Sequence, residues 1–108
     1  NKKKIYNLDG EYFKTNGFAS FQEDKPGLDV AREHGLTDNF LWANDFPHHE
    51  GTWPHSAEAI ERSMGQLDDA ERAKILGLNS ARIFNLPIPK RYLGQPDASK
   101  LAEKVGVL

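Results

Sequence analysis

The chain has 108 residues, which is enough for one domain. Its 14 basic and 16 acidic residues give a formal net charge of −2, which does not suggest the clustered basic face of a nucleic-acid-binding protein. No apolar stretch approaches the roughly 18 residues that a membrane-spanning helix needs. The absence of cysteine excludes disulfides, thiolate metal sites and cysteine nucleophiles, and we therefore expect a cytoplasmic protein.

The first predicted strand and helix lie between residues 17 and 35. The small and aromatic side chains of Gly17 to Phe21 are typical of a short strand. Asp24 predicts the start of a helix, because aspartate caps the first turn and the nearby Pro26 is tolerated there. Gly35 predicts the end of this helix.

A second strand and helix are predicted further along the chain. Phe40 to Ala43 form a compact apolar run, which predicts a strand buried on both faces, as parallel strands are. A polar loop rich in proline and histidine follows, and Ser56 is expected to cap the next helix. The apolar positions expected on the buried face of that helix are Ala57, Ile60, Met64 and Leu67.

The remaining residues are expected to form closing helices and a tail. Asp68 and Glu71 have the spacing of a capping box, and Pro87 is expected to end the helical region. Residues 89–108 are expected to form a C-terminal tail with a short helix from Ser99 to Lys104. The apolar stripe expected along the closing helices consists of Ala73, Leu76, Ser80 and Phe84.

Two successive strand-then-helix units predict an α/β fold with parallel strands and helical crossovers. Two strands cannot form a stable parallel sheet by themselves. We therefore expect the rest of the sheet to come either from a missing N-terminal region or from another copy of the chain.

Asp45 is the most informative single residue. It comes directly after the second predicted strand, and in α/β barrels the strand C-termini face the active site. A carboxylate in this position is suited to metal binding or proton transfer. The alternative for an isolated aspartate is that it caps the following loop.

The segment around Asp45 resembles the strand-eight motif of the amidohydrolase superfamily, in the branch of the aminocarboxymuconate-semialdehyde decarboxylase-like proteins. The motif, approximately W-x-S-D-[YF]-P-H and then T-W-P, stands here as Trp42 to His48 and Thr52 to Pro54. Residues 11–13, 21–24 and 67–86 resemble the flanking segments, with Asn79 to Arg82 in place of N-A-A-R.

This resemblance covers about residues 11–88 and implies the C-terminal fragment of a (β/α)8 TIM barrel. The fragment would contain the last two β/α units and the closing helices, with residues 1–88 forming the C-terminal part of the barrel domain.

The resemblance implies a divalent metal, commonly zinc, with Asp45 as a metal ligand and as the base that activates water. His48 matches the motif and is expected near the metal or the substrate. The family's other ligands, an H-x-H pair and a histidine from a middle strand, have no counterpart here, so the predicted site is incomplete in this chain. Asn44 replaces the usual serine or threonine.

Three further residues are predicted to bind a small-molecule substrate. Glu23 follows the first strand and is expected on the same face as Asp45. Trp53 and Phe46 are candidates for the wall of a pocket, although core packing is the simpler interpretation of Phe46. A metal site built by Asp45, His48, His49 and His55 alone is a less favoured hypothesis, because their spacing matches no familiar zinc pattern.

Three functions remain open from the sequence. The first is a metal-dependent hydrolase, and the second is a nonoxidative decarboxylase of an aromatic or muconate-type acid. The third is a catalytically silent barrel fragment that self-associates through its unpaired strand edges. No nucleic-acid or membrane partner is expected, whereas a homo-oligomer or a missing N-terminal barrel region is.

Overall fold

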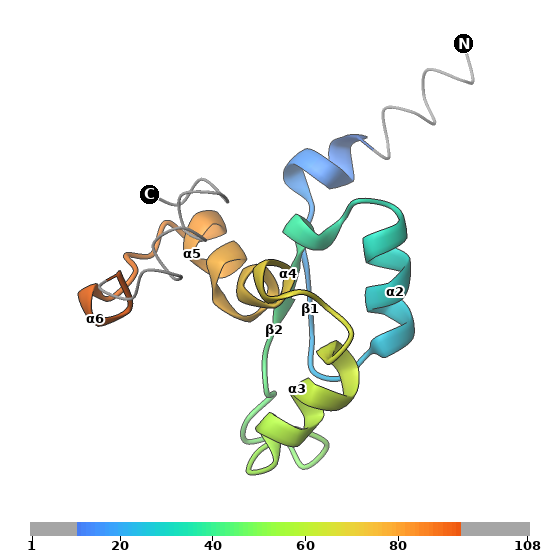
Figure 1. Ribbon diagram of the computed structural model, residues 1–108, viewed down its shortest axis with the longest axis vertical. Helices are drawn as coiled ribbons and strands as arrows, with labels where there is room; N and C mark the ends of the chain where they lie inside the picture. The colour runs from blue at the N-terminus through green and yellow to red at the C-terminus, as the bar shows by residue number, and fades with distance from the viewer. Residues whose placement is uncertain (1–10, 94–108) are drawn as a thin grey trace.

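The structure is a computed structural model, and it describes residues 11–93. Two short parallel strands lie beside a set of helices (Figure 1). Strand β1 spans Ala19–Phe21 and strand β2 spans Phe40–Trp42. They pair in register, with Ala19 opposite Phe40 and Phe21 opposite Trp42. The mixed α/β arrangement and the parallel strands are thus as predicted, while the predicted helix from Ser99 to Lys104 lies outside the described residues.

Helix α2 (Lys25–Glu33) connects the two strands and begins where the sequence predicted. The Asp24 carboxylate accepts a hydrogen bond of 2.9 Å from the backbone N–H of Gly27, which satisfies one of the free donors of the first turn. The chain leaves the helix through Gly35, whose φ of 68° is a left-handed conformation that glycine adopts without strain.

Strand β2 follows the short 3-10 helix η1 (Thr37–Asn39) and is less buried than predicted. Leu41 is buried, but its neighbours Phe40 and Trp42 are only partly buried. The prediction of a strand buried on both faces is therefore wrong for this structure. In its described part the sheet has two strands, so no third strand contributes side chains to cover these aromatic rings.

Helix α3 (Ser56–Met64) differs from the prediction at its start and on its buried face. The N-cap position is His55, and the Ser56 hydroxyl lies 3.0 Å from the Thr52 hydroxyl instead of capping the helix. Ala59 is buried in place of the predicted Ala57, which is exposed. The face is set by the packing of α3 against α2, where small side chains such as Ala59 allow close approach.

Helix α4 (Asp69–Ala73) begins at the predicted cap. The Asp68 carboxylate accepts a 2.8 Å hydrogen bond from the backbone N–H of Glu71. The Glu71 side chain does not complete the capping box in the structure, because both of its oxygens accept hydrogen bonds from Arg32 of α2. Glu71, which was predicted to cap α4, therefore connects α4 to α2.

The helical segment that follows contains a π-helical turn, η2 (Lys74–Leu78), before α5 (Asn79–Ile83). Ile75 and Asn79 are buried, whereas Leu76 and Phe84 of the predicted stripe are exposed. The stripe prediction is wrong because the segment packs against β2 with a different face, on which Ile75 and Asn79 lie four positions apart.

This helical segment ends before Pro87. Asn85 has a φ of 51°, and the N–H of Leu86 donates to the Ala81 carbonyl at 2.9 Å, so a left-handed C-terminal cap, and not a proline, ends the helix. A short helix, α6 (Lys90–Leu93), follows.

The core lies between the sheet and the helices. Its buried members come from α2, α3, η2 and the segment before α4, with rings from both strands packed against them. They are Leu28, Met64, Leu67 and Ile75, joined by Phe21, Trp42 and Ile60. Among residues 11–93, no helix is long and apolar enough to cross a membrane.

Candidate active site

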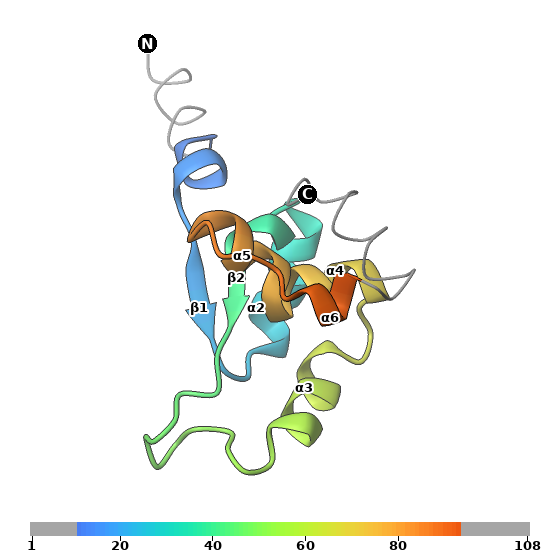
Figure 2. The ribbon, with the colours of Figure 1, turned by 90° about the vertical axis from the view of Figure 1, so that its left-hand side faces the viewer.

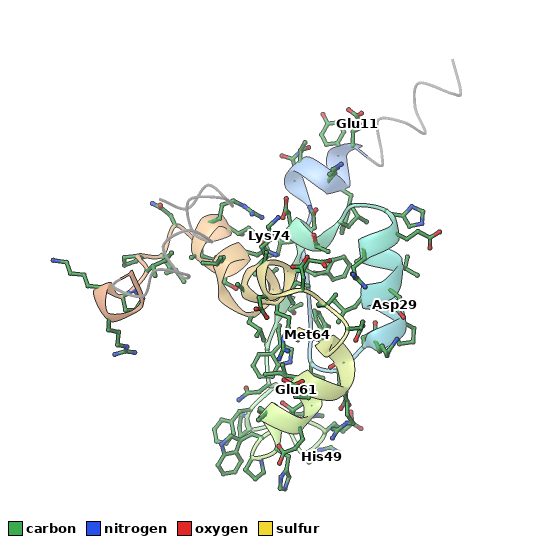
Figure 3. All side chains as sticks on the ribbon, in the orientation of Figure 1. Glu11, Asp29, His49, Glu61, Met64 and Lys74 are labelled. Carbon is green, nitrogen blue, oxygen red and sulfur yellow. The ribbon has the colours of Figure 1, made fainter. Side chains whose placement is uncertain are left out.

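The loop between β2 and α3 leaves the C-terminal end of the sheet and carries Asp45 (Figure 2). Glu23 follows the C-terminal end of β1, the neighbouring parallel strand. In Figure 3, His49 lies at the outer end of this loop, far from the central Met64. Asp45 comes after the C-terminal end of β2, as predicted, but two residues, Ala43 and Asn44, lie between the strand and Asp45.

The backbone at Asp45 is held in an uncommon conformation. Its φ is 57°, in the left-handed region that costs most residues free energy, although aspartate tolerates it better than others. The Asn44 side chain accepts a hydrogen bond of 3.1 Å from the N–H of Phe46, which is the local turn that a short polar side chain can stabilise. Asn44 therefore performs a structural task at the position where the related motif has serine or threonine.

The other side of the loop packs directly on this turn. The N–H of Thr52 donates to the Asn44 carbonyl at 3.0 Å. A Cβ atom added at Gly51 would lie 2.6 Å from the Asn44 carbonyl oxygen and 2.9 Å from that of Asp45. Glycine is required here because the two segments of the loop are in backbone contact.

Asp45 and His48 are close to each other. The carboxylate Oδ2 of Asp45 lies 3.5 Å from Nδ1 of His48, and the side chains are 57% and 51% exposed. The N–H of His48 also donates to the Asp45 carbonyl at 2.8 Å. His48 Nδ1 lies 3.3 Å from the N–H of Glu50, so neutral His48 can accept that hydrogen bond and protonated His48 can pair with Asp45.

Phe46 and Trp53 form an aromatic pair on the same loop. Their rings meet edge to face with centroids 5.3 Å apart, and they are 62% and 61% exposed. Core packing is therefore the wrong interpretation of Phe46 in this structure. A pair of exposed rings beside Asp45 is suited to contact an organic molecule, and substrate contact by either ring remains a prediction.

The structure pairs Glu23 with Arg62 of α3. The guanidinium donates from Nε to Oε1 at 2.8 Å and from Nη2 to Oε2 at 3.3 Å. These hydrogen bonds, together with the charge of Arg62, hold the pKa of Glu23 below its ordinary value against a smaller opposing effect of desolvation. Glu23 is thus an anion at neutral pH, and its predicted contact with substrate remains a prediction.

The donor types present suit a metal, but their number in the described residues does not. A zinc site usually takes three or four protein ligands. Across residues 11–93, no three histidine or acidic side chains come together in a way that could hold an ion. The alternative site built from Asp45, His48, His49 and His55 alone is therefore not formed, and His55 lies instead 3.9 Å from Glu58.

Two residues that sequence reasoning did not select also contact this region. The indole N–H of Trp42 donates to the Gln22 carbonyl at 2.8 Å, and Gln22 Nε2 donates to the Glu50 carbonyl at 2.8 Å. Their position at the ends of the two parallel strands was the signal that could have identified them.

Cavities among the described residues 11–93 lie away from this loop, and the two described next include no predicted site residue. The first, of about 570 Å³, is apolar and is lined mainly by η2, α5 and residues 86–89. The second, of about 600 Å³, lies between the helical residues before β1 and the end of α5. The predicted site residues of the loop are instead exposed at the surface, with Asp45, His48, Phe46 and Trp53 each more than half exposed.

Comparison with known proteins identifies the family. The family described as Amidohydrolase matches residues 3–86, which is more than half of the chain and includes both strands, the Asp45 loop and the closing helices. A search of curated proteins found no match. Proteins of the matched family generally use a divalent metal. With the matched segment spanning both β/α units, the chain belongs to the amidohydrolase family.

Proposed function

We propose that this chain supplies part of the active site of a metal-dependent hydrolase, with Asp45 as one metal ligand and as the base that activates water. The observation that carries the proposal is the place of Asp45, just past the C-terminal end of a parallel strand in a member of the amidohydrolase family. That end of the strands is where α/β barrels place catalytic groups.

The proposed chemistry assigns a separate task to each side chain. A divalent ion makes a water molecule acidic enough to deprotonate near neutral pH. The Asp45 carboxylate, which is 57% exposed, would bind this ion and accept a proton from a nearby water molecule. His48, at 3.5 Å, can hold the carboxylate in place and supply a positive charge when it is protonated.

The remaining parts of the proposed enzyme must come from outside the described residues. We propose that β1 and β2 are the last two strands of a (β/α)8 barrel. The other strands and metal ligands would come from another part of the polypeptide or from another subunit. Zinc is our first candidate for the ion, because imidazole and carboxylate groups are common zinc ligands. Phe46, Trp53 and Glu23 are our candidates for contacts with a small-molecule substrate.

We favour hydrolysis over decarboxylation because of Arg62. A basic group that binds the substrate carboxylate would favour a decarboxylase, and Arg62 of α3 lies beside Glu23, which follows the end of β1. Its guanidinium is already bound by both oxygens of Glu23. This pairing leaves Arg62 poorly placed to bind a second carboxylate.

The test is paramagnetic NMR with Co2+, which detects even weak binding by an incomplete site. If Asp45 is a metal ligand and His48 lies beside the metal, Co2+ will selectively perturb the backbone signals of residues 45–48. The Asp45→Asn substitution should weaken this effect at least about tenfold, because it removes an anionic ligand.

The matched control is Asp69→Asn, which makes the same chemical change in the first turn of α4. It should leave the Co2+ effect unchanged. Perturbation centred on His34 or on His55, or an equal response in the Asp45→Asn variant, would contradict the role proposed for Asp45.

A further inference from the structure

Gln22 joins the end of β1 to the loop that carries Asp45. Its side-chain Nε2 donates to the Glu50 carbonyl at 2.8 Å, across 28 positions of the sequence. Its own backbone carbonyl accepts the indole N–H of Trp42, the last residue of β2, at 2.8 Å. One residue therefore contacts both the end of β2 and the far side of the loop that begins there.

Most contacts of this loop are internal to it. His48 and Asp45 are hydrogen-bonded through their backbones, as are Thr52 and Asn44. These bonds define the shape of the loop but do not fix its position relative to β1. At the start of the loop the N–H of Ala43 donates to the Phe21 carbonyl. The Gln22 hydrogen bond connects the far side of the loop to the residue that follows β1.

A shift at Glu50 would reach Asp45 through direct contact. Gly51, the next residue, packs so closely that an added Cβ would come within 3.0 Å of the carbonyl oxygens of Asn44, Asp45 and His48. This contact is between backbone atoms and leaves little room for independent movement. The position of the Glu50 carbonyl thus sets the position of the backbone at Asp45.

We infer that Gln22 is a positioning residue for the proposed active site. It holds the loop of Asp45 and His48 at a fixed distance from β1 by donating to the Glu50 carbonyl. The importance of this position for catalysis rests on the proposed function, but the positioning itself is a separate physical property. Gln22 contacts neither a substrate nor a metal in this inference.

The test compares Gln22→Glu and Gln22→Ala with the unchanged chain by amide hydrogen exchange and proton NMR. Glutamate has nearly the same shape as glutamine but cannot donate at neutral pH. Both variants should increase exchange at Gly51 and Thr52 about threefold to tenfold, as expected for loss of one hydrogen bond. Exchange at the buried α3 residues Ala59 and Met64 should not change.

A second readout follows the aromatic pair. The rings of Phe46 and Trp53 meet edge to face with centroids 5.3 Å apart. The indole ring current therefore shifts the NMR signals of the Phe46 ring protons. Loosening of the loop should reduce this shift in Gln22→Glu. Gln22→Arg retains a donor of sufficient reach and should restore both the shift and the slow exchange.

The control is Gln66→Ala, because Gln66 also donates through Nε2, to the Ser63 carbonyl at 3.1 Å and to Oδ1 of Asp29 at 3.3 Å. It should leave residues 44–52 unaffected. Unchanged exchange at Gly51 and Thr52 in Gln22→Glu, or equal changes in Gln22→Glu and Gln66→Ala, would overturn the inference. The hydrogen-exchange and ring-proton measurements need no metal. A negative Co2+ test would therefore not affect the inference about Gln22, and a negative result for Gln22 would not affect the proposed role of Asp45.

Discussion

Asp45 combines the proposed chemical role with an unfavourable backbone conformation. With a φ of 57°, it occupies a region in which a Cβ atom costs about 1–2 kcal/mol relative to glycine. Asn44 and Gly51 keep it there through the turn hydrogen bond and the close backbone contact. Strain of this kind persists where the surroundings impose it and is frequent at functional sites.

Substitution of Asp45 should therefore separate stability from function. Asp45→Gly should be at least as stable as the unchanged chain, because glycine adopts this φ freely. Asp45→Ala should be about 1 kcal/mol less stable than Asp45→Gly. Urea unfolding would measure the stability of both variants. If Asp45→Gly were less stable than Asp45→Ala, Asp45 would not hold this conformation in solution.

At the scale of the elements, ion pairs between distant residues connect the helices and strand ends. Arg62 of α3 binds Glu23 after β1, and Arg32 of α2 binds Glu71 of α4 at 2.9 Å. Exposed pairs of this kind contribute little individually. The paired geometry with two hydrogen bonds nevertheless fixes how these elements face each other.

The Glu23–Arg62 pair should make stability depend on pH. The pKa of Glu23 is lowered from its ordinary value of 4.5 by its hydrogen bonds to Arg62, so the folded state binds this proton less readily than the unfolded state. The stabilisation is complete well above pH 4.5 and is lost as the pH falls from there through the lowered pKa.

Arg62→Gln should remove this dependence. The difference in urea stability between the unchanged chain and Arg62→Gln is expected to be largest at neutral pH and to shrink below about pH 4.5. This stability difference should also be smaller at 1 M salt, because the electrostatic screening length is then only about 3 Å. A difference that stays constant down to pH 3 would contradict the pairing.

Asn79 makes a second connection between elements, and this one is buried. Its Nδ2 donates to the carbonyls of Thr37 at 2.7 Å and Phe40 at 2.9 Å, and its side chain is fully buried. It therefore fastens the start of α5 to the segment that enters β2.

Asn79→Ala should lower the free energy of unfolding by about 2 kcal/mol, because the carbonyls of Thr37 and Phe40 lose their donor at a fully buried side chain. Asn85→Gly is the matched control, since Asn85 has a φ of 51° that glycine tolerates; it should be neutral or slightly stabilising. Thermal and urea unfolding of both variants would test this, and similar losses in the two would rule out a special role of Asn79.

At the scale of the whole molecule, the described sheet has two strands, and large apolar side chains remain exposed. Phe18 and Phe84 are 49% and 56% exposed and contact each other edge to face. These features are expected of a unit that packs against further structure.

We predict that the isolated chain self-associates at micromolar concentration. The Phe21 carbonyl faces β2, where it accepts from the N–H of Ala43, so the backbone of Ser20 faces the opposite edge of β1. Ser20→Pro removes a donor from that edge without breaking the pairing with β2, and it should shift the equilibrium toward the monomer.

Sedimentation equilibrium measures this association directly. A monomeric mass of the unchanged chain at these concentrations would contradict the prediction of a homodimer. Equal association of the unchanged chain and Ser20→Pro would show that the β1 edge is not the surface involved.

The sequence by itself determined the features that depend on neighbouring residues. Asp24 and Asp68 marked the starts of α2 and α4 correctly, because a cap is a contact across three positions. The two strands and their order were also predicted from short apolar runs, and parallel pairing followed from the helix between them. The place of Asp45 after β2 needed only that strand and the motif that follows it.

Only the tertiary structure decided which faces are buried and which distant groups meet. The packing of η2 and α5 against β2 buried Ile75 and Asn79 and left Leu76 exposed. Glu23 met Arg62, 39 positions away, and Gln22 met Glu50. Such contacts depend on how elements pack in three dimensions, which local patterns of polarity and spacing do not encode.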